Sequence, residues 1–390
     1  MILELHLIQN FAPSNLNRDE DGSPKDCIFG GLRRARISSQ CLKRAIRRES
    51  NFHKLLEANG GSVRTRRLIV EIAKRIMSDG QDLEKITKTV SEIFKEGGIE
   101  RPEKGEEGEK ENTKLLFFMS EKTIDQMAQK VKEQWDNLVN AETKKEVIKE
   151  LGELLANSVK SPDIALFGRM LEIDPKKPFG KINLGIDAAS QVAHAISTHK
   201  VDFSFDYFTA VDDLLEEGQL GAGMIGITGF NSACFYRYAN VNVEKLKENL
   251  QGDEDLTKAT IQAYIRAAVE AIPTGKQNSF ATHEKPSFVL AVLRDAGMCS
   301  LANAFVKPAK ESNDTDLISA SVAALERHWR KLADGYGDDS TKFVFNISNH
   351  ELTDLQSSPA NGGAAGENGS QMERLISNVV GAIKFKNTEA

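Results

Sequence analysis

The chain has 390 residues, of which 40 % are hydrophobic and 28 % are charged, a composition typical of a folded protein with a large core and more than one domain. It holds 51 basic and 57 acidic residues, and the resulting net charge of −6 argues against indiscriminate binding to nucleic acids or membranes. No apolar run reaches the roughly 18 residues of a membrane span. The N-terminus lacks the features of a secretion signal, so we expect a cytoplasmic protein.

The cysteines predict neither a metal site nor a disulfide framework. Cys27, Cys41, Cys234 and Cys299 show no CxxC spacing and have no nearby histidine partner. We therefore expect reduced, small core residues and no cofactor.

The chain begins with a predicted strand, loop and helix. Residues 2–9 alternate in the manner of a strand with one buried face. A polar loop covers residues 12–27, and Ser38 with Ser39 supplies capping residues for a helix over about 39–49.

This helix belongs to a stretch of concentrated positive charge. Seven basic residues lie among the sixteen positions from Arg33 to Arg48, and no acid occurs until Glu49. An ordinary solvated helix face is one interpretation, although such faces usually interleave the two signs. Ser38 and Gln40 add donors at a helix N-terminus, where the helix dipole favours phosphate. The pattern therefore favours a phosphate-binding surface.

From residue 52 to about 157 the pattern becomes helical. Apolar residues recur at i, i+3 and i+4 over residues 66–78, 82–96 and 120–139. Residues 96–111 interrupt this pattern with seven acids, three bases and four glycines, which is typical of a solvated loop. We expect a helical subdomain inserted after the first strand–helix unit.

Strand patterns return after residue 200. Residues 201–208 and 220–230 flank an acidic turn and predict a long irregular hairpin. Its alternating aromatic residues Phe203, Phe205 and Tyr207 favour a core face, whereas Phe208 is out of phase and is a candidate base-stacking platform. Further strands are expected at 233–243 and 286–295, and helices at 244–250, 258–272 and 317–332, before the glycine-rich loop 357–371.

This order predicts an α+β fold. A four-stranded core of ferredoxin-like or RNA-recognition (RRM) type, interrupted by two insertions, fits the sequence of elements. The usual aromatic RNA-binding motif of the RRM fold is absent, because residues 235–242 lack its glycine pattern.

The sequence contains few features that would indicate catalysis. Asp19, Glu20, Asp21 and Asp26 share one loop and are candidate Mg²⁺ ligands, but they fail the calcium-loop template. His194 and His199 are five residues apart, which is wrong for a metal pair on a helix, and no nucleophile or nucleotide-binding motif occurs. We expect no enzyme, with a metal-dependent nuclease as the alternative.

Several segments resemble a known family. They are residues 15–49, DIALFGRM at 163–170, residues 193–214, FYRYANVN at 235–242 and LANAF at 301–305. In this order they resemble the CasC family, the backbone subunit of the type I-E CRISPR Cascade complex.

The resemblance implies a modified RRM/ferredoxin-like palm, an inserted helical fingers domain and a protruding β-hairpin thumb. The palm would comprise residues 1–56 and 232–390, the fingers 57–195 and the thumb 196–231. Copies of the subunit would form a helical filament along the CRISPR RNA. Each thumb would kink the RNA and flip out one base, leaving the others to pair with target DNA. Large, small and end-capping Cascade subunits would be further partners.

The resemblance also implies the residues that contact RNA. Palm contacts would come from Arg18, Lys25, Arg34, Ser38, Gln40, Lys43, Arg44 and Arg47, with Lys276 as a further phosphate contact. The kinked base would meet Met170 of the fingers and Tyr207, Phe208 and Thr209 of the thumb.

Two alternatives remain open. In the first, this chain is a metal-dependent backbone subunit that cuts its bound target with the Asp19–Asp26 carboxylates, as related subunits of other CRISPR types cut RNA. A scaffold without RNA contact would instead need the basic patch to meet an acidic segment, such as residues 96–112 of another copy.

Overall fold

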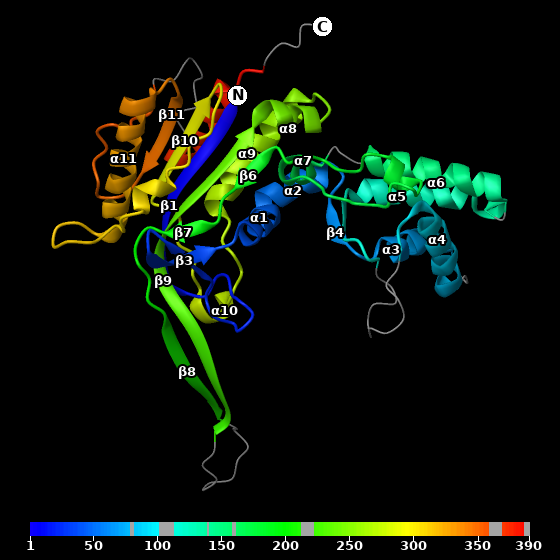
Figure 1. Cartoon of the computed structure of the whole chain (residues 1–390), viewed down its shortest axis with the longest axis horizontal. Coiled ribbons are helices and arrows are strands. Elements are labelled where there is room, and N and C mark those ends of the chain that lie inside the picture. Colours follow the sequence, from blue (N-terminus) through cyan, green and yellow to red (C-terminus); the bar gives the residue numbers. More distant parts are fainter. Residues whose placement is uncertain are drawn as a thin grey trace. The chain divides into compact units, whose positions relative to one another are not determined.

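The computed structural model describes residues 1–78, 82–100, 113–138, 140–157, 161–211, 222–358 and 369–385. The chain divides into two compact units, which Figure 1 colours along the sequence. The first comprises Met1–Phe52, Gln191–Asn242 and Ile261–Ala390, and the second comprises His53–Ser190 and Val243–Thr260. The predicted acidic loop, hairpin turn and glycine-rich loop lie largely outside the described residues.

The first unit is built on an antiparallel sheet. Within the described residues the sheet has nine strands in the order β11-β10-β1-β9-β7-β3-β2, with β6 and β8 also paired to β9. The strands are β1 Ile2–Ser14, β2 Asp26–Phe29, β3 Leu32–Ile37, β6 Ser190–Val192, β7 Ala195–Ser197, β8 Ser204–Val211, β9 Ala222–Asn242, β10 Phe288–Arg294 and β11 Thr341–Asn346.

Strand β1 confirms the first predicted strand but is buried on both faces. It lies between β9 and β10, and its polar residues Glu4 and His6 are fully buried. Glu4 accepts hydrogen bonds from Tyr238 Oη and Arg294 Nε, each at 2.7 Å. Burial, with a smaller effect of Arg294, lowers the pKa of His6 to about 3. The expectation of one exposed face was wrong, because polar residues on the second face have buried partners.

Helices pack on both faces of the central strands. The helices that lie wholly or largely in the first unit are α1 Ser39–Arg48, α9 Glu254–Glu270, α10 Gln277–Phe280, α11 Leu317–Tyr336 and α12 Gln371–Ala382, with the short helix η3 at Ala302–Phe305. Helix α2 Ser50–Ala58 begins in the first unit and belongs mostly to the second. Tyr236 of β9 lies in one core cluster with Trp329 of α11, and Phe235 lies in another with Leu42 of α1. Because consecutive strand residues point to opposite faces, α1 and α11 cover opposite faces of the sheet.

Strands β8 and β9 form the predicted hairpin, which extends beyond the sheet in Figure 1. The prediction had separated residues 220–230 from 233–243, but β9 is one continuous strand of 21 residues. Its first part pairs with β8 and its second part with β1.

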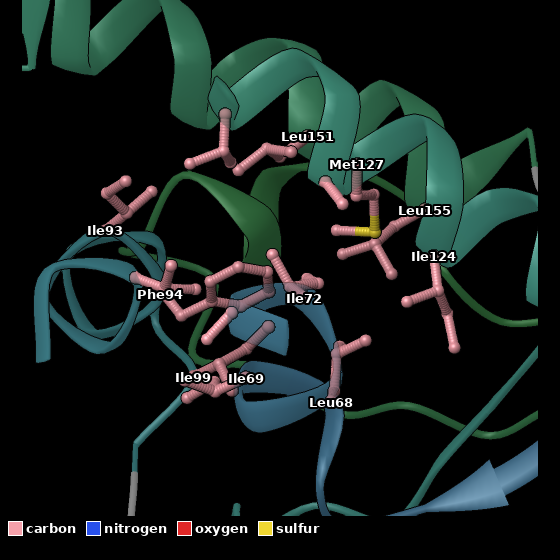
Figure 2. Close-up of a cluster of buried hydrophobic side chains, with 14 of the residues drawn as sticks. Leu68, Ile69, Ile72, Ile93, Phe94, Ile99, Ile124, Met127, Leu151 and Leu155 are labelled. Atoms are coloured by element: carbon pink, nitrogen blue, oxygen red, sulfur yellow. The ribbon is translucent and has the colours of Figure 1, made fainter. Parts of the chain in front are cut away.

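The second unit is mainly helical, as predicted for this part of the chain. Its elements are α3 Leu68–Ile76, α4 Leu83–Gly97, α5 Glu121–Glu133, α6 Ala141–Ala156, α7 Pro162–Phe167, α8 Val243–Asn249, the short helices η1 Trp135–Asn137 and η2 Phe179–Lys181, and the paired strands β4 Val63–Thr65 and β5 Phe117–Met119. Ile72, Phe94, Met127 and Leu151 converge in its core (Figure 2). None of the described helices of the chain is long and apolar enough to cross a membrane.

Glu326 joins α11 to the segment that follows β11. Its Oε1 accepts hydrogen bonds from the backbone N–H groups of Thr353, Asp354 and Leu355 at 2.7, 2.7 and 3.1 Å. Its Oε2 lies 2.7 Å from His350 Nε2. Burial alone would raise the pKa of Glu326, but these hydrogen bonds together lower it below its usual value.

We expect Glu326→Gln to lower the free energy of unfolding at pH 7 by about 1–3 kcal/mol, because a charged acceptor of several buried hydrogen bonds is lost. A carboxylate whose pKa is lower in the folded state than in the unfolded state stabilises the fold at pH values above its unfolded pKa of about 4.3. This stabilisation is lost as the pH falls through the folded-state pKa. The variant should therefore show a shallower loss of stability below pH 4.3 in urea titrations. The exposed Glu351→Gln is the control, and equal acid sensitivity of wild type and Glu326→Gln would contradict the assignment.

Candidate nucleic-acid interface

The loop after β1 is held in place by two buried or half-buried asparagines. Asn15 Nδ2 donates to Gly22 O at 2.9 Å and to Gly229 O at 2.8 Å, which joins the loop to the base of the hairpin. Asn17 Oδ1 accepts from the backbone N–H of Ser38 at 2.8 Å, which joins the loop to the start of α1. Three segments distant in sequence are thereby fixed next to one another.

Helix α1 begins where the sequence predicted. Ser38 is its N-cap and accepts from Cys41 N at 3.3 Å, while Arg47 and Arg48 occupy the last turn, where the helix dipole favours cations. Ser38 is only 8 % exposed, so its hydroxyl first serves the helix. Gln40 is exposed, and Lys43 is half-buried.

A groove of about 610 Å³, here called the α1 groove, runs along α1. Residues 16–19, α1 and residues 270–275 line it, and its basic side chains are Arg18, Arg44 and Arg48. No ion pair links these three arginines to a carboxylate in the described part of the chain.

Three carboxylates, Asp19, Glu49 and Glu270, also line the α1 groove, and each has a partner, which for Glu270 is Lys285 at 3.8 Å. Glu49 accepts hydrogen bonds from the N–H groups of Asn51 and Phe52, each at 3.0 Å. Asp19 Oδ1 accepts from Asp21 N and Ser23 N within its own turn. The groove therefore presents unpaired guanidinium groups beside carboxylates that serve the local fold, which favours an anionic ligand.

A second groove of about 520 Å³, the hairpin-base groove, adjoins the first. Residues 18–23, Phe205, residues 227–229 and Lys276 line it, and Arg18 and Asp19 are common to both grooves. Its basic side chains, Arg18 and Lys276, lie beside the carboxylates of Asp19, Glu20 and Asp21. Lys276 adopts a left-handed backbone conformation with φ of 50°. Directly before it, Gly275 packs so closely on the backbone that an added Cβ would lie 2.3 Å from Leu16 O. This contact brings Lys276 to the same surface as Arg18.

Arg34 corrects one of the sequence expectations. It is fully buried, and its Nη2 donates to Phe305 O at 2.8 Å while its Nε donates to Phe29 O at 3.3 Å. Its guanidinium satisfies backbone carbonyls and does not reach the surface, so we assign Arg34 to the fold and not to the interface. Lys25 is half-buried, and its backbone bonds to Asn17 and Arg36.

The aromatic residues of the hairpin are exposed. Tyr207 is 71 % exposed opposite Ile227, and Phe205 is 56 % exposed, so the prediction of a core face was wrong for these two residues. Phe203 is half-buried and packs against the core cluster of Phe235. Phe208 stands on the other face, 41 % exposed, with its ring over Gly226 of β9. Thr209 is also exposed. A two-stranded hairpin has no second layer to cover its apolar residues, which indicates a partner surface.

Met170 lies in the second unit and is 84 % exposed. Its neighbour Arg169 is buried and donates to Leu184 O at 2.9 Å and to Leu155 O at 3.0 Å. Burial lowers the pKa of Arg169 to about 10. Met170 is thus a large apolar side chain presented by a firmly anchored backbone.

The candidate metal ligands do not converge. Among the described residues, no three His, Cys, Asp or Glu side chains are grouped so that they would hold a metal ion. Asp26 instead pairs with Arg33 at 2.8 Å. His194 Nδ1 lies 3.1 Å from Arg36 Nη1, and burial, then Arg36 and Lys25, lower the pKa of His194.

Sequence reasoning missed Asn15, Asn17 and Gly275, which position the basic side chains, and it omitted Arg48 from the proposed contacts. Arg44 and Arg48 are one helical turn apart, and this spacing could have indicated that both side chains lie on the same side of α1. Nothing local in the sequence indicated which distant backbone Gly275 approaches.

We expect Gly275→Ala to displace the loop at residues 272–276 from the backbone at Leu16, because the added Cβ meets a carbonyl oxygen and not a flexible side chain. Amide exchange at Leu16 and Asn17 should accelerate at least about tenfold, corresponding to roughly 1.4 kcal/mol of lost local stability. Gly335→Ala is the matched control, since an added Cβ there meets open space. Unchanged exchange in Gly275→Ala would mean that this contact does not order the loop.

Comparisons with known proteins bear on the family and the fold of the chain. The model of the family described as "CT1975-like protein" matches residues 3–374. A solved chain titled "CRISPR RNA-guided surveillance complex, pre-nicking" is similar to this chain with a TM-score of 0.81 and 29 % identity. Another, titled "CRISPR RNA-guided surveillance complex", has a TM-score of 0.71 and 26 % identity. Each comparison covers 98 % of this chain and 100 % of the other.

No curated protein matches the chain in sequence at a significant level. The family match extends over nearly the whole chain, and the mixed α/β fold with its antiparallel sheet is similar to that of the two solved chains. The chain therefore belongs to the CT1975-like protein family, which is the CasC family that its segments resemble.

Proposed function

We propose that this chain is the CRISPR RNA-binding backbone subunit of a Cascade surveillance complex in antiviral defence. The observation that carries the proposal is the junction of the α1 groove and the hairpin-base groove at Arg18, with Arg44, Arg48 and Lys276 along them. Family membership and the likeness to chains from RNA-guided complexes support the same role.

The strand order supports an RRM-like palm. Strands β10-β1-β9-β7 follow the 4-1-3-2 order of a ferredoxin-like sheet, since β9 and β10 flank β1 and the chain between them is helical. We assign residues 1–56 and 232–390 to this palm, 57–195 to helical fingers and 196–231 to a thumb hairpin. The remaining strands β2, β3 and β11 extend the sheet at its edges.

The palm would hold the RNA by its phosphates. Guanidinium groups of Arg18 and Arg44 offer paired donors that match phosphate oxygens, and Lys276 adds a point charge. Gln40, Lys43 and Arg47 would extend the contact along α1, with Ser38 and Lys25 near its start. No contact of this kind reads a base, so sequence recognition of target DNA would be left to pairing with the guide.

The thumb would act on one base of the guide of an adjacent copy. Tyr207, Phe208 and Thr209 are exposed on the hairpin, and each aromatic ring offers a stacking surface worth roughly 1–3 kcal/mol per base. Met170 of the fingers would meet the same displaced base. The uncovered apolar faces of the hairpin support an assembly in which copies cover one another along the RNA, closed by the large, small and end-capping subunits.

The proposal assigns no catalytic step to the chain. Asp19 is engaged in its own turn and Asp26 in an ion pair with Arg33, which leaves the acidic loop poorly suited to hold Mg²⁺. The subunit would bind and present the guide without cleaving it.

We expect Arg44→Glu with Arg48→Glu to abolish assembly on RNA, because four units of charge change within one groove. The test is expression of the full chain in bacteria, followed by measurement of particle mass with and without RNase and identification of copurified RNA. Wild type should give a large RNase-sensitive particle, and the variant a small particle without RNA.

Lys145→Glu with Lys149→Glu is the matched control, since both lysines are exposed one helical turn apart on α6. An Arg44/Arg48 variant that keeps an RNase-sensitive particle would refute the assignment of the α1 groove. A wild-type oligomer that resists RNase would instead favour the scaffold without RNA contact.

Tyr207→Ala should leave assembly intact but weaken the periodic kink in the bound RNA. Most of the Tyr207 ring is exposed, so little folding energy depends on it. Chemical probing of the bound RNA should show regularly spaced reactive nucleotides in wild type and a more uniform pattern in the variant.

Tyr336→Ala, the same change at the exposed end of α11, serves as the control. Phe208→Ala should have the larger effect, because it also uncovers Gly226 on the partner strand. Identical reactivity patterns in wild type and both hairpin variants would exclude these rings as the element that displaces the base.

A further inference from the structure

A further groove with basic side chains lies on α11 and shares no lining residue with the α1 groove or the hairpin-base groove. Residues 303–315 and α11 enclose about 710 Å³, here called the α11 groove. Lys307, Lys310, Arg327 and Lys331 line it, and all four are exposed. No ion pair neutralises any of the four within the described residues.

No carboxylate lines the α11 groove to balance this charge. Glu311 and Asp314 belong to the same loop and are exposed, but neither is a lining residue. Asp316 is engaged as the N-cap of α11 and accepts from Ser319 N at 2.9 Å. Asp354 pairs with Arg330 at 3.2 Å. Four like charges in one concave site raise the local concentration of anions.

The chemistry of the lining favours phosphates over an acidic peptide. Apart from Val306 and Pro308, the apolar residues that line the groove are alanines, so it offers no deep pocket for the large side chains that anchor peptides. No Phe, Tyr or Trp lines it, which argues against base stacking. Lys and Arg side chains beside Asn303 and Ser312 match the donors that contact nucleic-acid backbones.

The α11 groove faces away from the α1 groove. Helix α11 packs on the face of β9 that carries Tyr236, and α1 packs on the face that carries Phe235. The sheet therefore separates the two basic surfaces, and a strand lying in one does not pass through the other.

We propose that the α11 groove binds the sugar–phosphate backbone of a second nucleic-acid strand, independently of its sequence. This strand is additional to the guide under the proposed function, which assigns the guide to the α1 groove. Arg327 and Lys331 stand one turn apart, about 6 Å along the helix, and face one run of phosphates.

The test uses the full chain with its copurified RNA and a labelled thymidine oligonucleotide of about 30 nucleotides as probe. Fluorescence anisotropy at several salt concentrations gives the affinity and its salt dependence. Arg327→Glu with Lys331→Glu should weaken binding at least about tenfold and reduce the slope of log affinity against log salt by about 1.4, for two lost phosphate contacts.

Lys145→Glu with Lys149→Glu carries the same change of charge on α6 and should bind the probe as wild type does. Arg327→Gln with Lys331→Gln, a milder variant, should show a smaller loss in the same direction and guards against misfolding. The Glu variant should keep its RNase-sensitive particle mass, since it leaves the α1 groove intact. The Arg44/Arg48 variant should still bind the probe even if the proposed function fails, so the two proposals are tested separately.

Wild type that does not bind the probe, or an Arg327/Lys331 variant that binds it equally well, would overturn the proposal. Loss of the RNA-dependent particle in that variant would overturn it as well, by placing the α11 groove on the guide path. Binding of a peptide with the sequence of residues 96–111 in preference to the probe would assign the groove to an acidic protein segment.

Discussion

Strand β9 is shared by the sheet and the hairpin, and the geometry of the interface depends on its pairing with β1. Residues 231–242 pair with β1, and residues 222–230 continue into the ladder with β8. The register is set by burial, since Phe235 and Tyr236 occupy different cores on opposite faces. A slip of one residue would exchange these faces. The same pairing therefore determines which face of the hairpin carries Tyr207.

The basic surface is positioned by contacts that carry no charge. Asn15 bridges two backbone carbonyls, one in its own loop and one in β9, and Gly275 permits backbone contact at Leu16. A buried amide with both donors satisfied and a residue without Cβ together hold three chain segments at close range. Arg18, Arg44 and Lys276 then lie on one surface without the free-energy cost of burying a charge, because their charged head groups remain in water. The rigid part of the site is neutral, and its ligand-facing part is cationic.

Local patterns predicted the elements whose signal lies within a few residues. The helix at Ser39–Arg48 followed from its cap and charge, and the strand predicted at residues 2–9 from its alternation, although β1 continues to Ser14 into the predicted loop. The hairpin of β2 and β3 was missed although Gly30 and Gly31, both with positive φ, form a two-residue turn. Strand β9 was predicted as two runs, 220–230 and 233–243, whereas pairing along its length keeps it extended as one strand.

The basic stretch shows why site residues were harder to predict than elements. Arg34 and Arg36 are neighbours of the same type in one charged run, yet Arg34 is fully buried against carbonyls and Arg36 is half-buried beside His194. Alternation with a period of two predicts that Arg34 lies on the face opposite Arg33. It does not predict that a backbone carbonyl of η3 lies on that face and accepts a hydrogen bond from the Arg34 guanidinium. A guanidinium suits such a position because it carries five donors in a fixed fork. The number of basic residues in a sequence segment therefore overstates the positive charge that the segment exposes at the surface.

An acidic protein with two grooves that present unpaired basic side chains separates its global charge from its local fields. At physiological salt the Debye length is about 8 Å, so each groove is governed by the charges that line it and hardly by the net charge of −6. The α1 and α11 layers stand on opposite faces of the sheet, and each helix is about 10 Å across. Exposed cations of the two grooves are therefore separated by more than one Debye length. Filling one groove with phosphates neither neutralises nor blocks the other, and the acidic remainder of the surface repels polyanions elsewhere. Under the two proposals, nucleic acid would be confined to two independent tracks on one subunit.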